Sequence, residues 1–211
     1  MSRPLLITDC DEVLLNLMPH VSEWLLEKYG YVFNIDLPDY AQAIRDPRTG
    51  EPVASECVWP LLEDFFDNEM HRQNVVPGAA AALEQIAGMA DVVVLTNLGD
   101  SYHANRVEQL ERFNIRHEVL CNQGGKGPPV RELVDRFRPS AAVFVDDFAS
   151  HHESVAELAP QVWRLHMIAE PRMAAVRPPA PRAHARIDHW DEALTWILER
   201  LEGGPAQAME A

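Results

Sequence analysis

The sequence lacks the features of an exported or membrane-spanning chain. It has no basic segment followed by an apolar signal core at its start, and nowhere do about 18 apolar residues run together. Basic residues are also scarce, since 18 Lys and Arg stand against 33 Asp and Glu, for a formal net charge of -15. That charge opposes binding to a phosphate backbone. We therefore expect a cytoplasmic protein with neither a nucleic-acid polymer nor a membrane as partner.

Cysteine is equally sparse. Cys10, Cys57 and Cys121 are odd in number, widely spaced and outside any CxxC pattern, which indicates reduced thiols in a cytosolic protein. Cys10 is flanked by Asp9 and Asp11 and could be a redox-active nucleophile. Those carboxylates should raise the pKa of its thiol and reduce its reactivity, so a packing role is the favoured interpretation.

The 211 residues suffice for a substantial core without disulfides or structural metal. Short apolar segments alternate with helical patterns, which predicts an α/β fold with a Rossmann-like parallel sheet and helices on both faces. Predicted strands are Leu5 to Thr8, Asp91 to Asn97, His117 to Cys121, Ala141 to Val145, Gln161 to Met167 and Ile187–Asp188. Predicted helices of this core lie at Ala79 to Gly88, Tyr102 to Phe113, Val130 to Phe137 and Trp190 to Leu201.

A helical insertion is predicted directly after the first strand. Residues 15–74 contain two amphipathic helical patterns, broken by prolines and Gly50, and none of this region resembles a strand. The predicted organisation is therefore a core of residues 1–14 and 75–202, an insertion of residues 15–74 and a disordered tail of residues 203–211. Residues 172–181 are expected to form a proline-rich surface connection.

The first predicted strand ends in two carboxylates, Asp9 and Asp11. Alternate residues of an extended chain face the same way, so both carboxylates can address one ligand beyond the carboxyl end of the strand. Two anions this close repel unless a proton or cation lies between them, and a divalent metal would supply the charge. The alternative interpretation is a solvated turn, in which Asp is common.

Two further predicted strands also end in polar residues. Thr96 and Asn97 close one, and Asp146 and Asp147 close the other. Lys126 lies between glycines in a loop that should reach the same edge of the sheet. Each feature alone has an ordinary structural explanation, such as a helix cap or a solvated lysine, but their convergence predicts one site.

These segments resemble the four motifs of the haloacid dehalogenase (HAD)-like superfamily, in order and in structural context. The motifs read ITDCDEV, VVVLTN, GGKG and AVFVDD, and the resemblance covers about residues 5–165. It implies that residues 15–74 are a small helical cap on a HAD-like core. It also implies a phosphatase or related phosphotransferase acting on a small phosphorylated substrate.

The resemblance assigns a role to each candidate residue. Asp9 would attack phosphorus, and Asp11 would transfer protons to the leaving group and from water. Mg²⁺ would be the cofactor, held by Asp9, the backbone carbonyl of Asp11 and Asp147, with Asp146 orienting Lys126 or a metal-bound water. The phosphoryl oxygens would be bound by Thr96, the backbone amide of Asn97, and Lys126.

Several alternatives remain open. A non-catalytic phosphate- or partner-binding protein could keep this fold, and a 2-haloacid dehalogenase could share it, although Asp11 argues against the latter. Residues 9–30 also look like the 5'(3')-deoxyribonucleotidases, which suggests a nucleotide as one possible substrate. Glu12 stands where many relatives have Gly, and His151 stands where some carry an acid. The sequence indicates no particular oligomeric state.

His151 and His152 are consecutive on a predicted helix, so their side chains point about 100° apart. This geometry makes a shared transition metal the weaker interpretation, and a solvated or phosphate-adjacent pair the favoured one.

Overall fold

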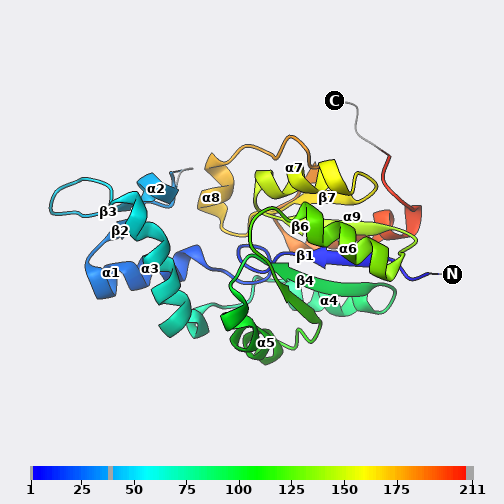
Figure 1. The fold of residues 1–211 in the computed structure, drawn as a ribbon, viewed down its shortest axis with the longest axis horizontal. Helices are drawn as coiled ribbons and strands as arrows, with labels where there is room; N and C mark the ends of the chain where they lie inside the picture. The colour runs from blue at the N-terminus through cyan, green and yellow to red at the C-terminus, as the bar shows by residue number, and fades with distance from the viewer. Residues whose placement is uncertain (1, 38–39, 208–211) are drawn as a thin grey trace.

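The computed structural model describes residues 2–37 and 40–207, and it contains a six-stranded parallel sheet (Figure 1). The strand order is β5-β4-β1-β6-β7-β8, and every neighbouring pair is parallel. The strands are β1 (Leu5–Thr8), β4 (Asp91–Thr96), β5 (Glu118–Cys121), β6 (Ala142–Asp146), β7 (Trp163–His166) and β8 (Ala185–Arg186). The predicted α/β fold is thereby confirmed.

Helices cover both faces of this sheet. The helices of the core are α4 (Ala79–Ala87), α5 (His103–Arg112), α6 (Gly127–Phe137), α7 (Ala149–Leu158) and α9 (Trp190–Gly203), with the 3-10 turn η2 (Asp100–Tyr102) before α5. Leu5 and Ile7 of β1 pack in the cluster that contains buried residues of α6 and α7. Leu6, between them, packs in the cluster with α4 and α9. This alternation explains why β1 is apolar at successive positions, as expected for a central parallel strand.

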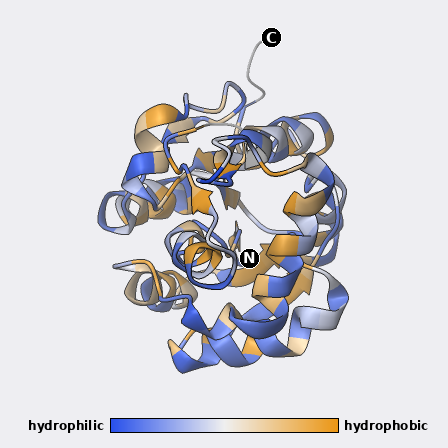
Figure 2. Ribbon diagram, turned by 90° about the vertical axis from the view of Figure 1, so that its left-hand side faces the viewer, coloured by the Kyte–Doolittle hydropathy of each residue, from blue (hydrophilic) through white to orange (hydrophobic). Residues whose placement is uncertain are grey.

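Residues between β1 and β4 form a second, smaller unit beside the sheet, seen at the left of Figure 1. Its elements are α1 (Met18–Tyr29), β2 (Val32–Phe33), α2 (Tyr40–Ala43), β3 (Ile44–Arg45), α3 (Ser55–Asn68) and the 3-10 turn η1 (Met70–Arg72). Buried residues such as Trp24 and Phe65 form a separate hydrophobic cluster there. The side view in Figure 2 shows hydrophilic and hydrophobic bands alternating along the helices.

One expectation for this unit requires correction. The sequence suggested no strand in residues 15–74, yet β2 and β3 pair antiparallel, with Val32 opposite Arg45 and Phe33 opposite Ile44. Each strand has only two residues, too few for an alternating pattern to be detected. Residues 38–39 of this segment lie outside the described part of the chain.

The predicted proline-rich connection is partly helical. Residues Pro171–Val176 form α8, with Pro171 in its first turn and the Glu170 side chain accepting a hydrogen bond from the Arg172 amide. Met173 of α8 and Ile168 before it are buried in the same cluster as Trp24 and Phe65. The connection therefore reaches across to the smaller unit, and Figure 1 shows α8 between the two.

The C-terminal region differs in detail from the expectation. The last strand is Ala185–Arg186, two residues before the predicted Ile187–Asp188. Beyond α9 the chain stays packed as far as Ala206, whose amide donates to the Gln161 carbonyl. The rest of the predicted disordered tail, residues 208–211, lies outside the described residues. Within residues 2–37 and 40–207, no helix has both the length and the apolar character needed to cross a bilayer.

The packing of α8 predicts an asymmetric mutational effect. Met173→Ala should lower the free energy of unfolding by about 2–4 kcal/mol, because it opens a cavity between α8 and the smaller unit. The matched control is Val176→Ala on the same helix, where the side chain is exposed and the change should stay within about 0.5 kcal/mol. Urea unfolding of both variants measures the difference, and equal losses would contradict this account.

Candidate active site

The candidate site centres on one buried ammonium group between two carboxylates. Lys126 Nζ lies 2.6 Å from Asp9 Oδ1 and 2.7 Å from Asp146 Oδ2, and its side chain is fully buried. Asp9 follows β1 directly, and Asp146 ends the neighbouring strand β6. Parallel pairing brings these two strand ends together, so residues far apart in sequence share one edge of the sheet.

The glycines around Lys126 have a direct steric cause. A Cβ atom on Gly127 would lie 2.2 Å from the Ser154 carbonyl oxygen of α7, and one on Gly125 would lie 2.7 Å from Ser154 Oγ. The Gly127 amide donates to the same Ser154 hydroxyl at 2.9 Å. Only glycine allows the backbone to approach α7 this closely, and that approach places Lys126 at the start of α6.

Asp147 completes a group of three buried carboxylates. One oxygen each from Asp9, Asp146 and Asp147 lies within 4.8 Å of the others, which makes this trio a possible metal site among the described residues. The oxygens of Asp146 are engaged, one by Lys126 and the other by the Phe148 amide. In contrast, Asp147 Oδ1 is buried and has no hydrogen-bond partner in the described part of the chain.

The pKa values reflect this crowding. Burial raises the pKa of Asp9 to about 7, against the opposing effect of Lys126. Burial, followed by repulsion from Asp146 and Asp9, raises the pKa of Asp147 well above its usual value. Burial is the largest single effect on Asp146 and would raise its pKa, but Lys126, His151 and His152 together outweigh burial and lower the pKa of that group. The trio has three carboxyl groups, and Lys126 pairs with only two of them, Asp9 and Asp146. Such an arrangement is suited to binding a cation.

Thr96 and Asn97 lie at the end of β4, the strand on the other side of β1. Thr96 Oγ1 is buried without a partner among the described residues. The Asn97 side chain is exposed and donates to the Gly124 carbonyl at 2.8 Å, which ties this strand end to the loop before Lys126. The polar ends of β1, β4 and β6 therefore meet at one edge, as the motif positions predicted.

The Asp11 side chain lies outside the trio of carboxylates. Arg106 Nη2 donates to both Asp11 oxygens, at 3.0 and 2.9 Å, and Gln73 Nε2 donates to Oδ1 at 2.7 Å. Arg106 is on α5 and fully buried, and Gln73 is in the segment that returns from α3 to the sheet. The structure thus gives the predicted proton-transfer residue two partners.

Neither of these partners was found from the sequence. The predicted apolar face of Val107, Leu110 and Phe113 does pack in or against the core cluster, but the buried residues of α5 also include Arg106 and Gln109. A buried arginine has no periodic signal of its own, because Arg is normally counted with the solvent face.

Glu12 stands where many HAD-like proteins have Gly, and the structure shows how a glutamate is accommodated there. Its backbone is in the left-handed region, with a φ of 58°, where glycine is the usual residue. Its buried side chain accepts hydrogen bonds from the amides of Leu17 and Met18, at 2.8 and 2.7 Å, at the start of α1. Burial raises the pKa of Glu12 to about 7 despite these two bonds. Capping of the helix offers compensation for an unfavourable backbone conformation.

The remaining candidates have separate surroundings. His152 is fully buried with Nε2 3.0 Å from the Asp146 carbonyl, whereas His151 Nε2 lies 3.3 Å from the amide nitrogen of Asn97. The two rings thus face different partners, as the helical geometry predicted. The favoured interpretation of a solvated or phosphate-adjacent pair is wrong for His152, because its ring is buried against Phe144. Cys10 is buried, and burial raises the pKa of its thiol, which agrees with a packing role.

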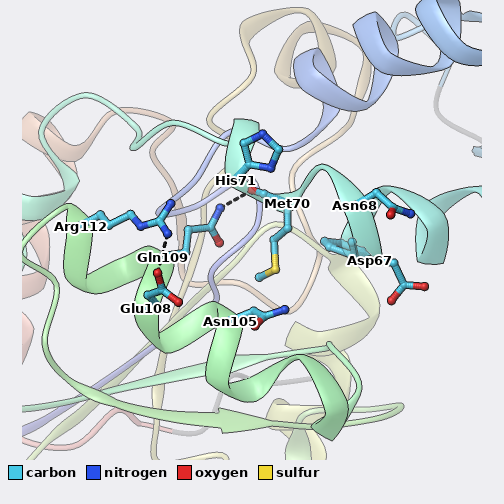
Figure 3. A pocket seen from close by; sticks show the side chains of 9 residues that line it. Asp67, Asn68, Met70, His71, Asn105, Glu108, Gln109 and Arg112 are labelled. Atoms are coloured by element: carbon cyan, nitrogen blue, oxygen red, sulfur yellow. Dashed lines mark hydrogen bonds and ion pairs between the residues drawn. The ribbon is translucent and has the colours of Figure 1, made fainter.

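The site does not coincide with either of two cavities elsewhere. A cavity of about 180 Å³ lies between the end of the α3–η1 segment and α5 (Figure 3). It is lined by Phe66, Asp67, Asn68, Met70, His71, Asn105, Glu108, Gln109 and Arg112. A second, of about 290 Å³, lies beside α8 and Asp188–His189. Neither includes a predicted site residue.

Comparison with known proteins identifies the fold. No protein-family model matches the chain, and no curated protein matches it. Solved structures do match. The magnesium-bound HAD-hydrolase YfnB from Bacillus subtilis is 10% identical with a TM-score of 0.64, covering 93% of this chain and 99% of that one. A candidate phosphoglycolate phosphatase from Lactobacillus plantarum is 18% identical with a TM-score of 0.60, covering 92% and 99%.

A HAD family hydrolase from Deinococcus radiodurans R1, with bound phosphate and sodium, is 13% identical with a TM-score of 0.54, covering 96% and 98%. At these identities the similarity concerns architecture. The chain therefore has the fold of the HAD-like hydrolases, as the four motifs implied, and nearly its whole length takes part in the match.

The ion pairs of Lys126 predict a large loss of stability on neutralisation. Lys126→Met should lower the free energy of unfolding by about 3–5 kcal/mol near pH 7, because Asp9 and Asp146 would remain buried without compensation. The only other lysine, Lys28, forms a partly exposed pair with Asp64, so Lys28→Met should cost at most about 1 kcal/mol. Chemical denaturation of both variants compares the two sites, and a Lys126→Met loss no larger than the control would refute the prediction.

Proposed function

We propose that this protein is a Mg²⁺-dependent phosphomonoesterase that acts on a small phosphorylated metabolite through a phospho-Asp9 intermediate. The observation that carries the proposal is the meeting of Asp9, Lys126 and Asp147 with Thr96 at adjacent strand ends. Two buried oxygens there, on Thr96 and Asp147, have no partner among the described residues. A phosphoryl group would accept a hydrogen bond from the Thr96 hydroxyl, and a cation would bind the Asp147 carboxylate oxygen.

In the first step, an Asp9 oxygen would form a bond to phosphorus while the bond from phosphorus to the leaving oxygen breaks. In the second, water would attack phosphorus, the Asp9 carboxylate would leave, and inorganic phosphate would be released. Asp11 is the candidate base that takes the proton of the attacking water. Asp9 suits the role of nucleophile because it is the most exposed of the three carboxylates, with 6% of its surface accessible against 3% for Asp147 and 0% for Asp146.

The negative charge on the transferred phosphoryl group would be balanced by a cation and by hydrogen-bond donors of this site. Lys126 supplies a fixed positive charge, and the pKa of this ammonium is raised because its neighbours Asp146 and Asp9 outweigh the effect of burial. The Thr96 hydroxyl and the Asn97 backbone amide are the proposed donors to phosphoryl oxygens. Groups fixed before the reaction stabilise developing charge without a reorganisation cost.

The donors present fit Mg²⁺, a hard cation that takes oxygen ligands. Asp9 and Asp147 would be direct ligands together with the Asp11 carbonyl, and Asp146 would position Lys126. When bound, the ion would neutralise the repulsion between Asp9 and the substrate. The fit rests on the buried, unpartnered Asp147 oxygen and on the excess of acid in the trio.

We also propose that residues 15–74 act as a cap over this site. In support, they form their own hydrophobic cluster beside the carboxyl edge of the sheet. Such a cap would exclude water around a small substrate. The Lactobacillus structure is described as a candidate phosphatase, and the Deinococcus structure holds phosphate, which agrees with phosphate chemistry in this fold. A nucleotide remains one possible substrate on the sequence resemblance alone.

The direct test is hydrolysis of an aryl phosphate with and without Mg²⁺. Wild-type protein should turn over only with the ion, and Asp9→Asn should reduce kcat by at least about a thousandfold. Asp135→Asn, an exposed aspartate on α6, is the matched control and should retain activity. Metal binding without turnover over a broad phosphate panel would favour a binding protein, and halide release from haloacids without Mg²⁺ would favour a dehalogenase.

Metal affinity should rise with pH. Asp9, with its pKa of about 7, holds a proton in part of the metal-free protein at neutral pH, and Mg²⁺ must displace that proton; the raised pKa of Asp147 acts in the same direction. Between about pH 6 and 8 the apparent affinity should increase up to about tenfold per unit for each proton released. Titration calorimetry in two buffers of different ionisation enthalpy measures the proton release directly. Affinity that is independent of pH would show that both groups are already ionised.

A further inference from the structure

Two buried histidines lie against the backbone of the Asp146–Asp147 pair. His152 is on α7 and His166 ends β7, and their exposed fractions are 0% and 2%. His152 Nε2 lies 3.0 Å from the Asp146 carbonyl oxygen, and His166 Nε2 lies 2.9 Å from the Asp147 carbonyl oxygen. A carbonyl oxygen can only accept, so each ring donates its Nε2 hydrogen. Each acid of the pair is thus bound through its backbone by a different histidine.

The donor role of His166 is fixed by its other ring nitrogen. The Ala180 amide donates to His166 Nδ1 at 3.0 Å, so Nδ1 is the acceptor and the ring hydrogen lies on Nε2. Ala180 is buried in the connection between α8 and β8. This connection therefore holds the His166 ring in the orientation from which it binds the Asp147 carbonyl. With both nitrogens engaged, His166 has none left to ligate a metal.

The two rings also hold each other in place. Their centroids lie 5.5 Å apart with an edge-to-face geometry, and His152 packs in the same way on Phe144 of β6. His152 Nδ1 is buried without a hydrogen-bond partner among the described residues. The bond to the Asp146 carbonyl is therefore the contact that offsets the cost of burying this polar ring.

The backbone of Asp147 determines where its carboxylate lies. The chain leaves β6 at Asp146 and enters α7 at Ala149, so Asp147 lies in a link of two residues. The Phe148 amide in this link donates to Asp146 Oδ1, whereas the Asp147 carbonyl is bound by His166. With its carbonyl fixed, Asp147 keeps its carboxylate within the trio that it forms with Asp9 and Asp146.

We propose that His152 and His166 are positioning residues that fix the backbone of Asp146 and Asp147 and thereby set the affinity of the site for Mg²⁺. This inference rests on the metal site of the proposed function. Groups that hydrogen-bond to metal ligands orient those ligands, and their loss typically lowers metal affinity about 10–100-fold. Here the histidines act on the backbone of the acids, since their Nε2 hydrogens are given to carbonyl oxygens.

Titration calorimetry with Mg²⁺ tests the role of His166. His166→Met removes the N–H, so the dissociation constant should rise about 10–100-fold. His166→Gln keeps an N–H at the ε position and should recover most of that loss. The Mg²⁺ concentration that gives half-maximal hydrolysis of an aryl phosphate should shift in parallel, whereas kcat at saturating Mg²⁺ should change little.

The matched control is His184→Met. His184 lies in the same connection and accepts a hydrogen bond from the Arg164 amide of β7, away from the Asp146–Asp147 pair. This variant should lose stability in urea unfolding but keep the wild-type affinity for Mg²⁺. A loss of affinity equal to that of His166→Met would show a general effect of destabilisation and refute the positioning role.

A second pair of variants, His152→Met against His152→Gln, gives the same comparison at the Asp146 carbonyl and applies even if His166→Met does not fold. Unchanged Mg²⁺ affinity in the folded Met variants, or equal losses in the Met and Gln variants, would overturn the inference and leave the proposed function intact. Wild-type protein that binds no Mg²⁺ would overturn the proposed metal site and, with it, the inference.

Discussion

The ion pairs of Lys126 with Asp9 and Asp146 are the interaction on which the arrangement of the site depends. One buried ammonium joins the ends of two neighbouring strands, and its position follows from two glycines that let the backbone approach α7. Charge compensation and close packing are therefore linked here. The third carboxylate, Asp147, is not paired with this lysine; its Oδ2 lies 4.0 Å from Arg177 Nη1, and its other oxygen is buried without a hydrogen-bond partner among the described residues.

The positions of the central strands and of the polar residues at their ends could be predicted from the sequence, because they follow from the local apolar pattern and from parallel topology. A buried strand must be apolar at successive positions, so β1, β4 and β6 are visible, and the carboxyl ends of parallel strands share one edge. That rule alone brings Asp9, Thr96 and Asp147 together. Glycines around Lys126 indicated a loop at this edge of the sheet, but the complete burial of the lysine gave no local signal.

The missed features depend on partners distant in sequence. Arg106 and Gln73 contact Asp11 across 95 and 62 residues, and a single sequence does not show such pairing. The helix α8 was obscured by the prolines around it, and its burial against the smaller unit is a tertiary effect. The strands β2 and β3 are too short to show a period. Each was decided by packing rather than by intrinsic propensity.

The left-handed backbone of Glu12 has one more consequence. Glu12 binds the first amides of α1, where the chain enters the smaller unit, and the adjacent Asp11 binds Gln73, where the chain comes back. The chain passes between the sheet and the smaller unit twice, and consecutive side chains, those of Asp11 and Glu12, form hydrogen bonds to both connecting segments. Both residues lie within three positions of Asp9. The positions of the smaller unit and of the chain just after Asp9 are therefore coupled through these three hydrogen bonds.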